Sequence, residues 1–197
     1  TGGVIDAFDT GVLSTGMSSG RATGDSSFAR VYFDTPTRAQ PNPSNYMTGY
    51  AAMPVFSESG LYHTQEFSLA LSCKTRNAKI YYTLDGSVPS QDSLLYTEAV
   101  TISSNTPIRA IAYKEGLVPS EVNSITFLFD APHNVPVFCI VGDPEQMNHV
   151  LTTNRRTNKP EYESSVKYFE ADGTLGVSFN CGLRPKGRSS MDNPQNS

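Results

Sequence analysis

The chain has 197 residues, of which 38% are hydrophobic and 17% are charged, and it contains 15 Gly and 13 Pro. Soluble domains usually have roughly 45–50% apolar and about 25% charged residues, so this composition argues against long helices and favours short strands joined by turns. The net charge of −4 argues against a nucleic-acid partner, because phosphate binding needs clustered Lys and Arg. No apolar run approaches the roughly 20 residues of a membrane span. The chain begins Thr1-Gly2-Gly3 without a Met, so we expect no signal peptide in it and expect it to be a piece of a longer protein.

Three zones follow one another along the chain, and the first covers residues 1–54. It is rich in Gly, Ser, Thr and Asp and has two strand-like stretches, at 3–8 and 28–33. A connector follows at 36–43 (PTRAQPNP), because its prolines cannot sit in a central strand. We therefore expect a partial β domain that ends in an irregular linker.

The second zone, 55–129, has the clearest strand pattern. Large apolar residues fall at every second position in 67–73 and again in 79–84, which predicts two half-buried strands. Further strands are expected at 100–102, 108–113 and 122–129, at a spacing typical of an Ig-like β-sandwich. The residues predicted to share one core are Phe67, Leu69, Leu71, Ile80, Tyr82, Leu84, Ile108, Ala110 and Ala112.

The third zone, 130–197, predicts an α+β segment. A buried strand at 135–141 precedes a helix at 144–151, for which Asp143 is a suitable N-cap and Pro144 a suitable first residue. Two strands follow at 165–170 and 176–183. The second carries an apolar face that either docks on the sandwich, which we expect, or pairs with another chain. We expect 189–197 to be mobile. The fold class is thus all-β: a central Ig-like β-sandwich flanked by partial domains, the last of them α+β.

The second zone resembles the chitobiase/β-hexosaminidase C-terminal domain, also called the fibronectin-III-associated module. The resemblance rests on four stretches: 80–90 (IYYTLDGSVPS), 93–96 (SLLY), 108–112 (IRAIA) and 119–122 (PSEV). Such modules are Ig-like sandwiches appended to extracellular bacterial proteins and glycosidases. The resemblance implies architecture, not catalysis.

The third zone is similar to the opening of a CotH-type kinase domain, in 134–138 (NVPVF), 169–173 (FEADG) and 182–190 (GLRPKGRSS). The family pattern G-x-R-x-x-G-x-S-S is met, but the lysine usual soon after it is replaced by Asn196. The resemblance covers the family's first quarter or so. It implies that the carboxylates that bind metal and transfer phosphate lie beyond Ser197, so ATP and a divalent metal are cofactors only of a complete kinase-like domain. We expect no cofactor in this chain.

The first zone resembles the closing half of a lamin-tail domain, in 4–6 (VID), 18–21 (SSGR) and 32–37 (YFDTPT), with Asn42 soon after. The Pro-Gly usual after this stretch is here Arg38-Ala39. Lamin-tail, chitobiase-type and CotH-type segments often occur in this order in bacterial proteins that are secreted or attached to the cell surface. The resemblances together imply an extracellular or surface location.

Two sets of side chains are candidate binding residues. Arg184, Lys186 and Arg188 alternate along the chain, so on a strand they would share one face, which either binds phosphate or is a solvated edge. Aromatic faces stack on sugar rings, and the candidates for such a sugar-binding platform are Tyr81, Tyr96 and Tyr113. The alternative is that these tyrosines pack in the core or at an edge.

Other chemistry has little support in the sequence. Asp85-Gly86 is either a hairpin turn or, with Asp92, part of a calcium site. The histidines, His63, His133 and His149, lie in three unrelated contexts, so we expect no metal site and no catalytic residue. Cys139 and Cys181 either form a bridge or, with Cys73, are free buried thiols.

Three functions therefore stand side by side. The first is a non-catalytic structural region that presents a neighbouring domain of an extracellular or surface-attached bacterial protein. The second is a fragment of a CotH-type ATP-dependent protein kinase, and the third is a carbohydrate-binding module. The expected partners are neighbouring domains of the parent chain, a carbohydrate or a cell-surface protein.

Overall fold

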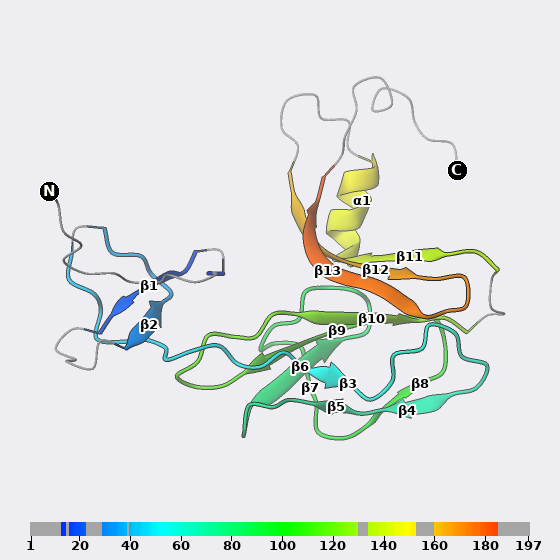
Figure 1. Ribbon diagram of the computed structural model, residues 1–197, viewed down its shortest axis with the longest axis horizontal. Helices are drawn as coiled ribbons and strands as arrows, with labels where there is room; N and C mark the ends of the chain where they lie inside the picture. Colours follow the sequence, from blue (N-terminus) through cyan, green and yellow to red (C-terminus); the bar gives the residue numbers. More distant parts are fainter. Residues whose placement is uncertain are drawn as a thin grey trace, which may run out of the picture.

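The structure is a computed structural model that describes residues 13–14, 16–22, 29–38, 40–129, 134–152 and 160–184. Within these ranges it consists of short strands with a single helix (Figure 1), as the all-β prediction requires. The strand expected at 3–8 lies outside the described residues, and so does the segment 189–197.

A β-sandwich occupies the middle of the chain. One layer is the four-stranded sheet β10-β9-β6-β7, formed by Asn123–Phe127, Thr106–Tyr113, Lys79–Thr83 and Leu94–Leu95. The other layer is formed by two short antiparallel pairs, β3 (Val55–Phe56) with β5 (Leu71–Ser72) and β4 (Phe67–Leu69) with β8 (Val100–Ile102). The strand expected at 67–73 divides at Ala70, where the chain changes partner from β8 to β3.

The core lies between these two layers. Leu69, Leu71, Ile80, Ile108 and Ala110 belong to one buried cluster, as the alternation predicts. Ala112 is also buried, and the partly buried Phe67 and Tyr82 pack against the cluster. Leu84 was wrongly assigned to the core: its side chain is 37% exposed, because β6 ends at Thr83 and Leu84 already belongs to the turn.

A third β layer lies against one end of the outward face of the four-stranded sheet (Figure 1). It is the antiparallel sheet β11-β12-β13, formed by Val137–Gly142, Tyr162–Phe169 and Leu175–Leu183. The inner face buries Phe169 and Val141. The expected docking is thus confirmed, but it uses the face opposite to the one predicted.

The outer face of this sheet stays largely open. Val177 and Phe179 are 49% and 50% exposed, and Phe138 and Ile140 of β11 are exposed as well. Register pairs of the ladder share a face, and Ile140 pairs with Val166, which pairs with Phe179. The strand expected to be buried at 135–141 is therefore buried on one face only.

The helix α1 (Pro144–Thr152) covers one end of this outer face. The N-cap prediction is confirmed, because Asp143 Oδ1 accepts hydrogen bonds from the backbone N–H groups of Glu145 and Gln146 at 3.1 and 3.0 Å. The Tyr162 hydroxyl and His149 Nδ1, 2.6 Å apart, join the helix to β12.

The first zone contributes a separate hairpin, β1 (Ser18–Arg21) with β2 (Arg30–Phe33). Its own small cluster consists of Ala22, Val31 and Phe33. The chain that follows this hairpin contacts the sandwich through a parallel β-bridge between Tyr50 and Val118.

Candidate functional site

The contact between the sandwich and the third sheet contains the most buried charge among the described residues. Arg109 lies on the central strand β9 between Ile108 and Ala110, which face the core. Since side chains of a strand alternate, Arg109 points outward. It is nevertheless 0% exposed, because β12 covers it.

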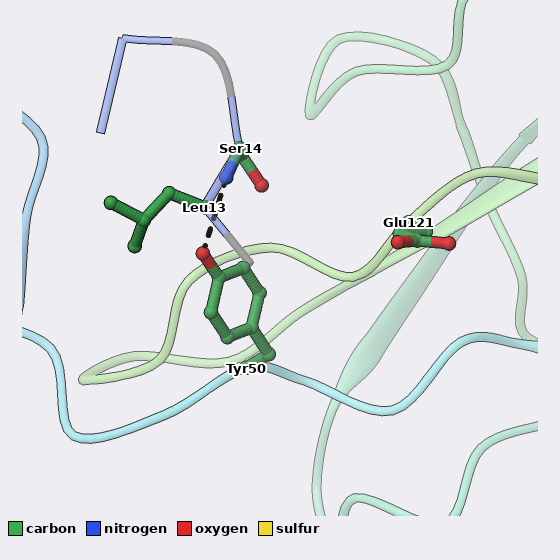
Figure 2. Close-up of a pocket in the computed structure, with 4 residues that line it drawn as sticks. All are labelled: Leu13, Ser14, Tyr50 and Glu121. Carbon is green, nitrogen blue, oxygen red and sulfur yellow. Dashed lines mark hydrogen bonds between the residues drawn. The ribbon is translucent and has the colours of Figure 1, made fainter. Parts of the chain in front are cut away.

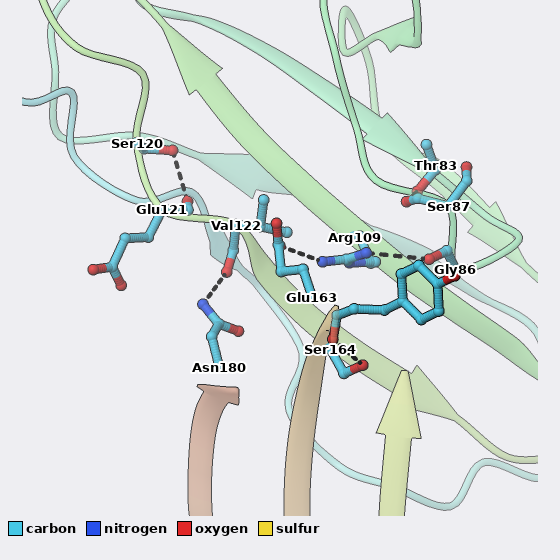
Figure 3. A network of polar contacts seen from close by, with 11 residues as sticks. Thr83, Gly86, Ser87, Arg109, Ser120, Glu121, Val122, Glu163, Ser164 and Asn180 are labelled. Atoms are coloured by element: carbon cyan, nitrogen blue, oxygen red, sulfur yellow. Dashed lines mark hydrogen bonds and ion pairs between the residues drawn. The ribbon is translucent and has the colours of Figure 1, made fainter. Parts of the chain in front are cut away.

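Two groups from different segments meet this guanidinium (Figure 3). The Nη2 atom donates to Glu163 Oε1 of β12 at 2.7 Å, and Nη1 donates to the carbonyl of Gly86 at 3.3 Å. Burial lowers the pKa of Arg109, while Glu163 and Asp143 oppose that effect. The Nε atom has no hydrogen-bond partner in the described part of the chain, so Glu163 is the main compensation for burying this charge.

Gly86 brings the turn after β6 into the same contact. Its φ is +85°, a left-handed conformation that L side chains rarely adopt, and a Cβ added there would lie 2.9 Å from the carbonyl oxygen of Gly142. The Asp85-Gly86 turn is confirmed as a turn: Asp85 Oδ1 accepts from the Ser87 hydroxyl at 2.6 Å and from the Ser87 N–H at 2.9 Å. These hydrogen bonds lower the pKa of Asp85.

Further polar groups line the same junction. Asn180 of β13 donates to the Val122 carbonyl at 3.1 Å (Figure 3). Cys139 and Lys167 are register partners on the inner face of the third sheet. Burial raises the pKa of Cys139 and lowers that of Lys167, so the thiol is protonated at neutral pH and is not set up as a nucleophile.

The outward face of the four-stranded sheet continues beyond the junction. Tyr81 of β6 and Tyr113 of β9 lie there with ring centroids 5.6 Å apart. Tyr96, the other sugar-stacking candidate, is on the opposite side, where it packs near Tyr82 against the core. The structure thus brings two of the three tyrosines together and separates the third.

The phosphate candidates are only partly described. The Arg184 side chain is 66% exposed, and its Nη1 atom lies 4.0 Å from Glu161 Oε2, whereas Lys186 and Arg188 lie outside the described residues. Phosphate binding at this strand stays a prediction.

The cysteines are free. Cys139 and Cys181 lie on β11 and β13 with β12 between them. The two strand spacings between them already amount to about 10 Å, and their register partners on β12, Lys167 and Ser164, are three residues apart, so the cysteines are too far apart for a disulfide. They also face opposite sides of the sheet, because Cys139 pairs with Lys167 and Cys181 pairs with Ser164.

Histidines have packing roles where they are described. His63 stacks on Phe67 with centroids 4.2 Å apart, and its Nε2 lies 3.1 Å from the Gly60 carbonyl. His133 lies outside the described residues. Among those described, no group of three or more His, Cys, Asp and Glu could hold a metal ion.

A small cavity of about 230 Å³ marks where the start of the described chain meets the sandwich. Figure 2 shows the Tyr50 hydroxyl pointing at Ser14, whose backbone N–H donates to it at 3.3 Å. Leu13 and Glu121 complete the described lining. This arrangement joins two segments and brings together no set of catalytic side chains.

Comparison with known proteins supports one of the resemblances. Residues 57–124 match the family model of the chitobiase/beta-hexosaminidase C-terminal domain. This stretch holds most of the sandwich, including Arg109, Gly86, Tyr81 and Tyr113. No curated protein and no solved structure matches the chain.

The comparison leaves the two flanking zones unassigned, so the lamin-tail and CotH-type resemblances remain predictions. None of the helices in the described ranges is long and apolar enough to cross a membrane.

Arg109 is the residue of this junction that the sequence analysis did not predict. In the sequence it lies within the stretch 108–112 that resembles the family. The available signal was a lone cation at an outward position of a strand that is otherwise apolar (IRAIA). A side chain of this kind on a sheet face that another layer covers needs an acidic partner.

Proposed function

We propose that this chain is a non-catalytic structural region in which the chitobiase-type sandwich holds the third sheet in one fixed orientation. The observation that carries the proposal is Arg109, a fully buried cation whose compensating carboxylate, Glu163, comes from the sheet that is held. Undocking would remove this carboxylate from the guanidinium and uncover Phe169 and Val141. Both effects oppose independent motion of the two parts.

The rest of the proposal concerns the parent protein. The lamin-tail and CotH-type resemblances of the flanking zones support an extracellular or surface-attached bacterial protein. Its neighbouring domains are the partners we propose for the open apolar face around Phe179 and Ile140, since exposed apolar patches of this kind mark interaction surfaces.

Nuclear spin relaxation tests the fixed orientation. Backbone ¹⁵N relaxation of the full chain should give one rotational correlation time for residues 57–124, 137–152 and 160–183. Glu163→Ala should separate the two sets, whereas the exposed neighbour Glu161→Ala should leave them equal. Two correlation times in the unmodified chain would overturn the proposal.

The kinase alternative has its own test. The full chain is incubated with labelled ATP, Mg²⁺ or Mn²⁺ and a Ser-rich protein acceptor. We expect no transfer above a heat-inactivated sample, and clear incorporation would show that the chain is an enzyme.

A further inference from the structure

A cleft of about 580 Å³ opens on the outward face of the four-stranded sheet, beside the connection between β9 and β10. Tyr81 and Tyr113 lie on its floor, both half-buried. Arg109 lies four residues from Tyr113 on the same strand and face, which is about 13 Å along the strand. The cleft is therefore separate from the junction with the third sheet.

The two tyrosine rings form a corner. Their planes meet at 86° with centroids 5.6 Å apart. Aromatic faces offer an electron-rich apolar surface, on which the C–H face of a pyranose ring packs. One ring can serve as the floor under a sugar and the other as a wall against its edge. A corner accommodates one sugar ring, whereas a long chain needs several rings in a row.

Hydrogen-bonding groups surround this corner. Asn77 and Gln91 line the cleft, and in the described part of the chain their side-chain amides make no hydrogen bond. Asn77 is held in the left-handed region, at φ 57°, by the turn before β6. An amide offers donors and an acceptor at once, which is what the hydroxyl groups of a sugar need.

The charges around the cleft balance. Lys79 and Lys114 line it with Glu115, and Asp92 is close enough to help raise the pKa of Tyr113, although burial is the larger cause. A raised pKa keeps this hydroxyl protonated, so it can donate. Two cations and two anions favour a neutral ligand over a uronic acid or a sulfated sugar.

We propose that this cleft binds the terminal pyranose residue of a neutral glycan. Tyr81 and Tyr113 supply the stacking corner, and Asn77 and Gln91 supply the hydrogen bonds. The site lies within the chitobiase-type sandwich and does not depend on how the third sheet is presented.

The test is a ¹⁵N-NMR titration of the full chain with cellobiose, N,N′-diacetylchitobiose and lactose, up to millimolar concentrations. The hexasaccharides that correspond to the first two disaccharides are titrated in the same way. We expect at least one disaccharide to shift the amide signals of Tyr81, Tyr113 and Asn77. If cellobiose or N,N′-diacetylchitobiose binds, the corresponding hexasaccharide should bind with nearly the same molar affinity, because only the chain end enters the corner.

Matched variants keep the test decisive. Tyr113→Leu and Tyr81→Leu retain apolar bulk but lose the ring, and each should weaken binding about tenfold, as loss of an aromatic contact would. Tyr46→Leu, at a tyrosine that is 37% exposed and outside the cleft, should leave binding unchanged. Signals that shift elsewhere, or no shift with any of these neutral sugars, would overturn the proposal.

Discussion

Removing the carboxylate of Glu163 should destabilise the whole chain more than removing the guanidinium that it compensates. Glu163→Ala leaves Arg109 charged and buried, with only the carbonyl of Gly86 at 3.3 Å. Arg109→Met takes the cation away and leaves a carboxylate whose side chain is 52% exposed, so water can solvate it. The asymmetry follows from where each partner lies.

The size of the effect is bounded by two cases. Breaking a fully buried ion pair costs about 3–5 kcal/mol, and exposed pairs contribute about 0–1 kcal/mol. Arg109 belongs to the first case and Glu163 lies nearer the second. We therefore expect about 3 kcal/mol for Glu163→Ala and about 1–2 kcal/mol for Arg109→Met. The double variant should lie close to Arg109→Met, because the acid has nothing left to compensate.

Urea unfolding of the full chain measures this, with far-UV circular dichroism and tyrosine fluorescence as probes, since the chain has 10 Tyr and no Trp. The midpoint should fall for Glu163→Ala, and the slope should fall with it, because the separated parts already expose surface that unfolding would otherwise expose. The control is Glu161→Ala, which removes the partner of an exposed ion pair with Arg184 at 4.0 Å and should cost within about 0.5 kcal/mol. Additive single effects, or equal losses for Glu163→Ala and Glu161→Ala, would refute the reasoning.

Three further predictions concern the sandwich. Gly86→Ala should destabilise the chain by clearly more than the about 1–2 kcal/mol that a left-handed alanine costs, because its Cβ would meet the Gly142 carbonyl. Thermal melting measures the loss, with Gly116→Ala as the control, since Gly116 has φ +77° but lies in open space. Equal losses for the two variants would contradict the close contact. Leu71→Ala should lower the free energy of unfolding by about 2–5 kcal/mol, since the side chain is 5% exposed, and a loss within about 0.5 kcal/mol would place it on the surface. The Ser87 hydroxyl and N–H lower the pKa of Asp85 below its usual 3.8. The contribution of the Asp85 carboxylate to stability is therefore present above that pH and lost as pH falls through the lowered pKa, so the destabilisation by Asp85→Asn should shrink in acid. A constant difference in stability across that range would be the contrary result.

Local patterns predicted the parts of the fold that local physics decides. Period-two alternation placed Leu69, Leu71 and Ile108 in the core, because a strand with one buried face has no other stable register. The Asp143 cap and the Asp85-Gly86 turn also came from residues that hydrogen-bond within a few positions of themselves. The core prediction for Leu84 was wrong because the alternation of apolar residues continues in the sequence after the strand itself has ended.

Contacts between distant segments could not be predicted in this way. Arg109 and Glu163 are 54 residues apart, and nothing in either neighbourhood names the other. Both faces of β11 carry apolar residues, so the sequence did not decide which one docks. The structure uses the face of Val141 and leaves Phe138 67% exposed. For the tyrosines, the alternation that puts Tyr82 inward puts Tyr81 outward, so the sequence itself distinguishes these two.

One face of one sheet carries both proposals, and the strand β9 shows how it is divided. Its outward residues include Arg109, Ile111 and Tyr113, at every second position. The third sheet covers Arg109 completely, so that it is 0% exposed. Ile111 is 8% exposed, and Tyr113 is only half-buried beside an open cleft. An arginine at the covered end needs a carboxylate from the covering sheet, and a tyrosine at the open end is satisfied by a ring partner and by solvent. The chemistry of each outward side chain thus matches the extent of the layer above it.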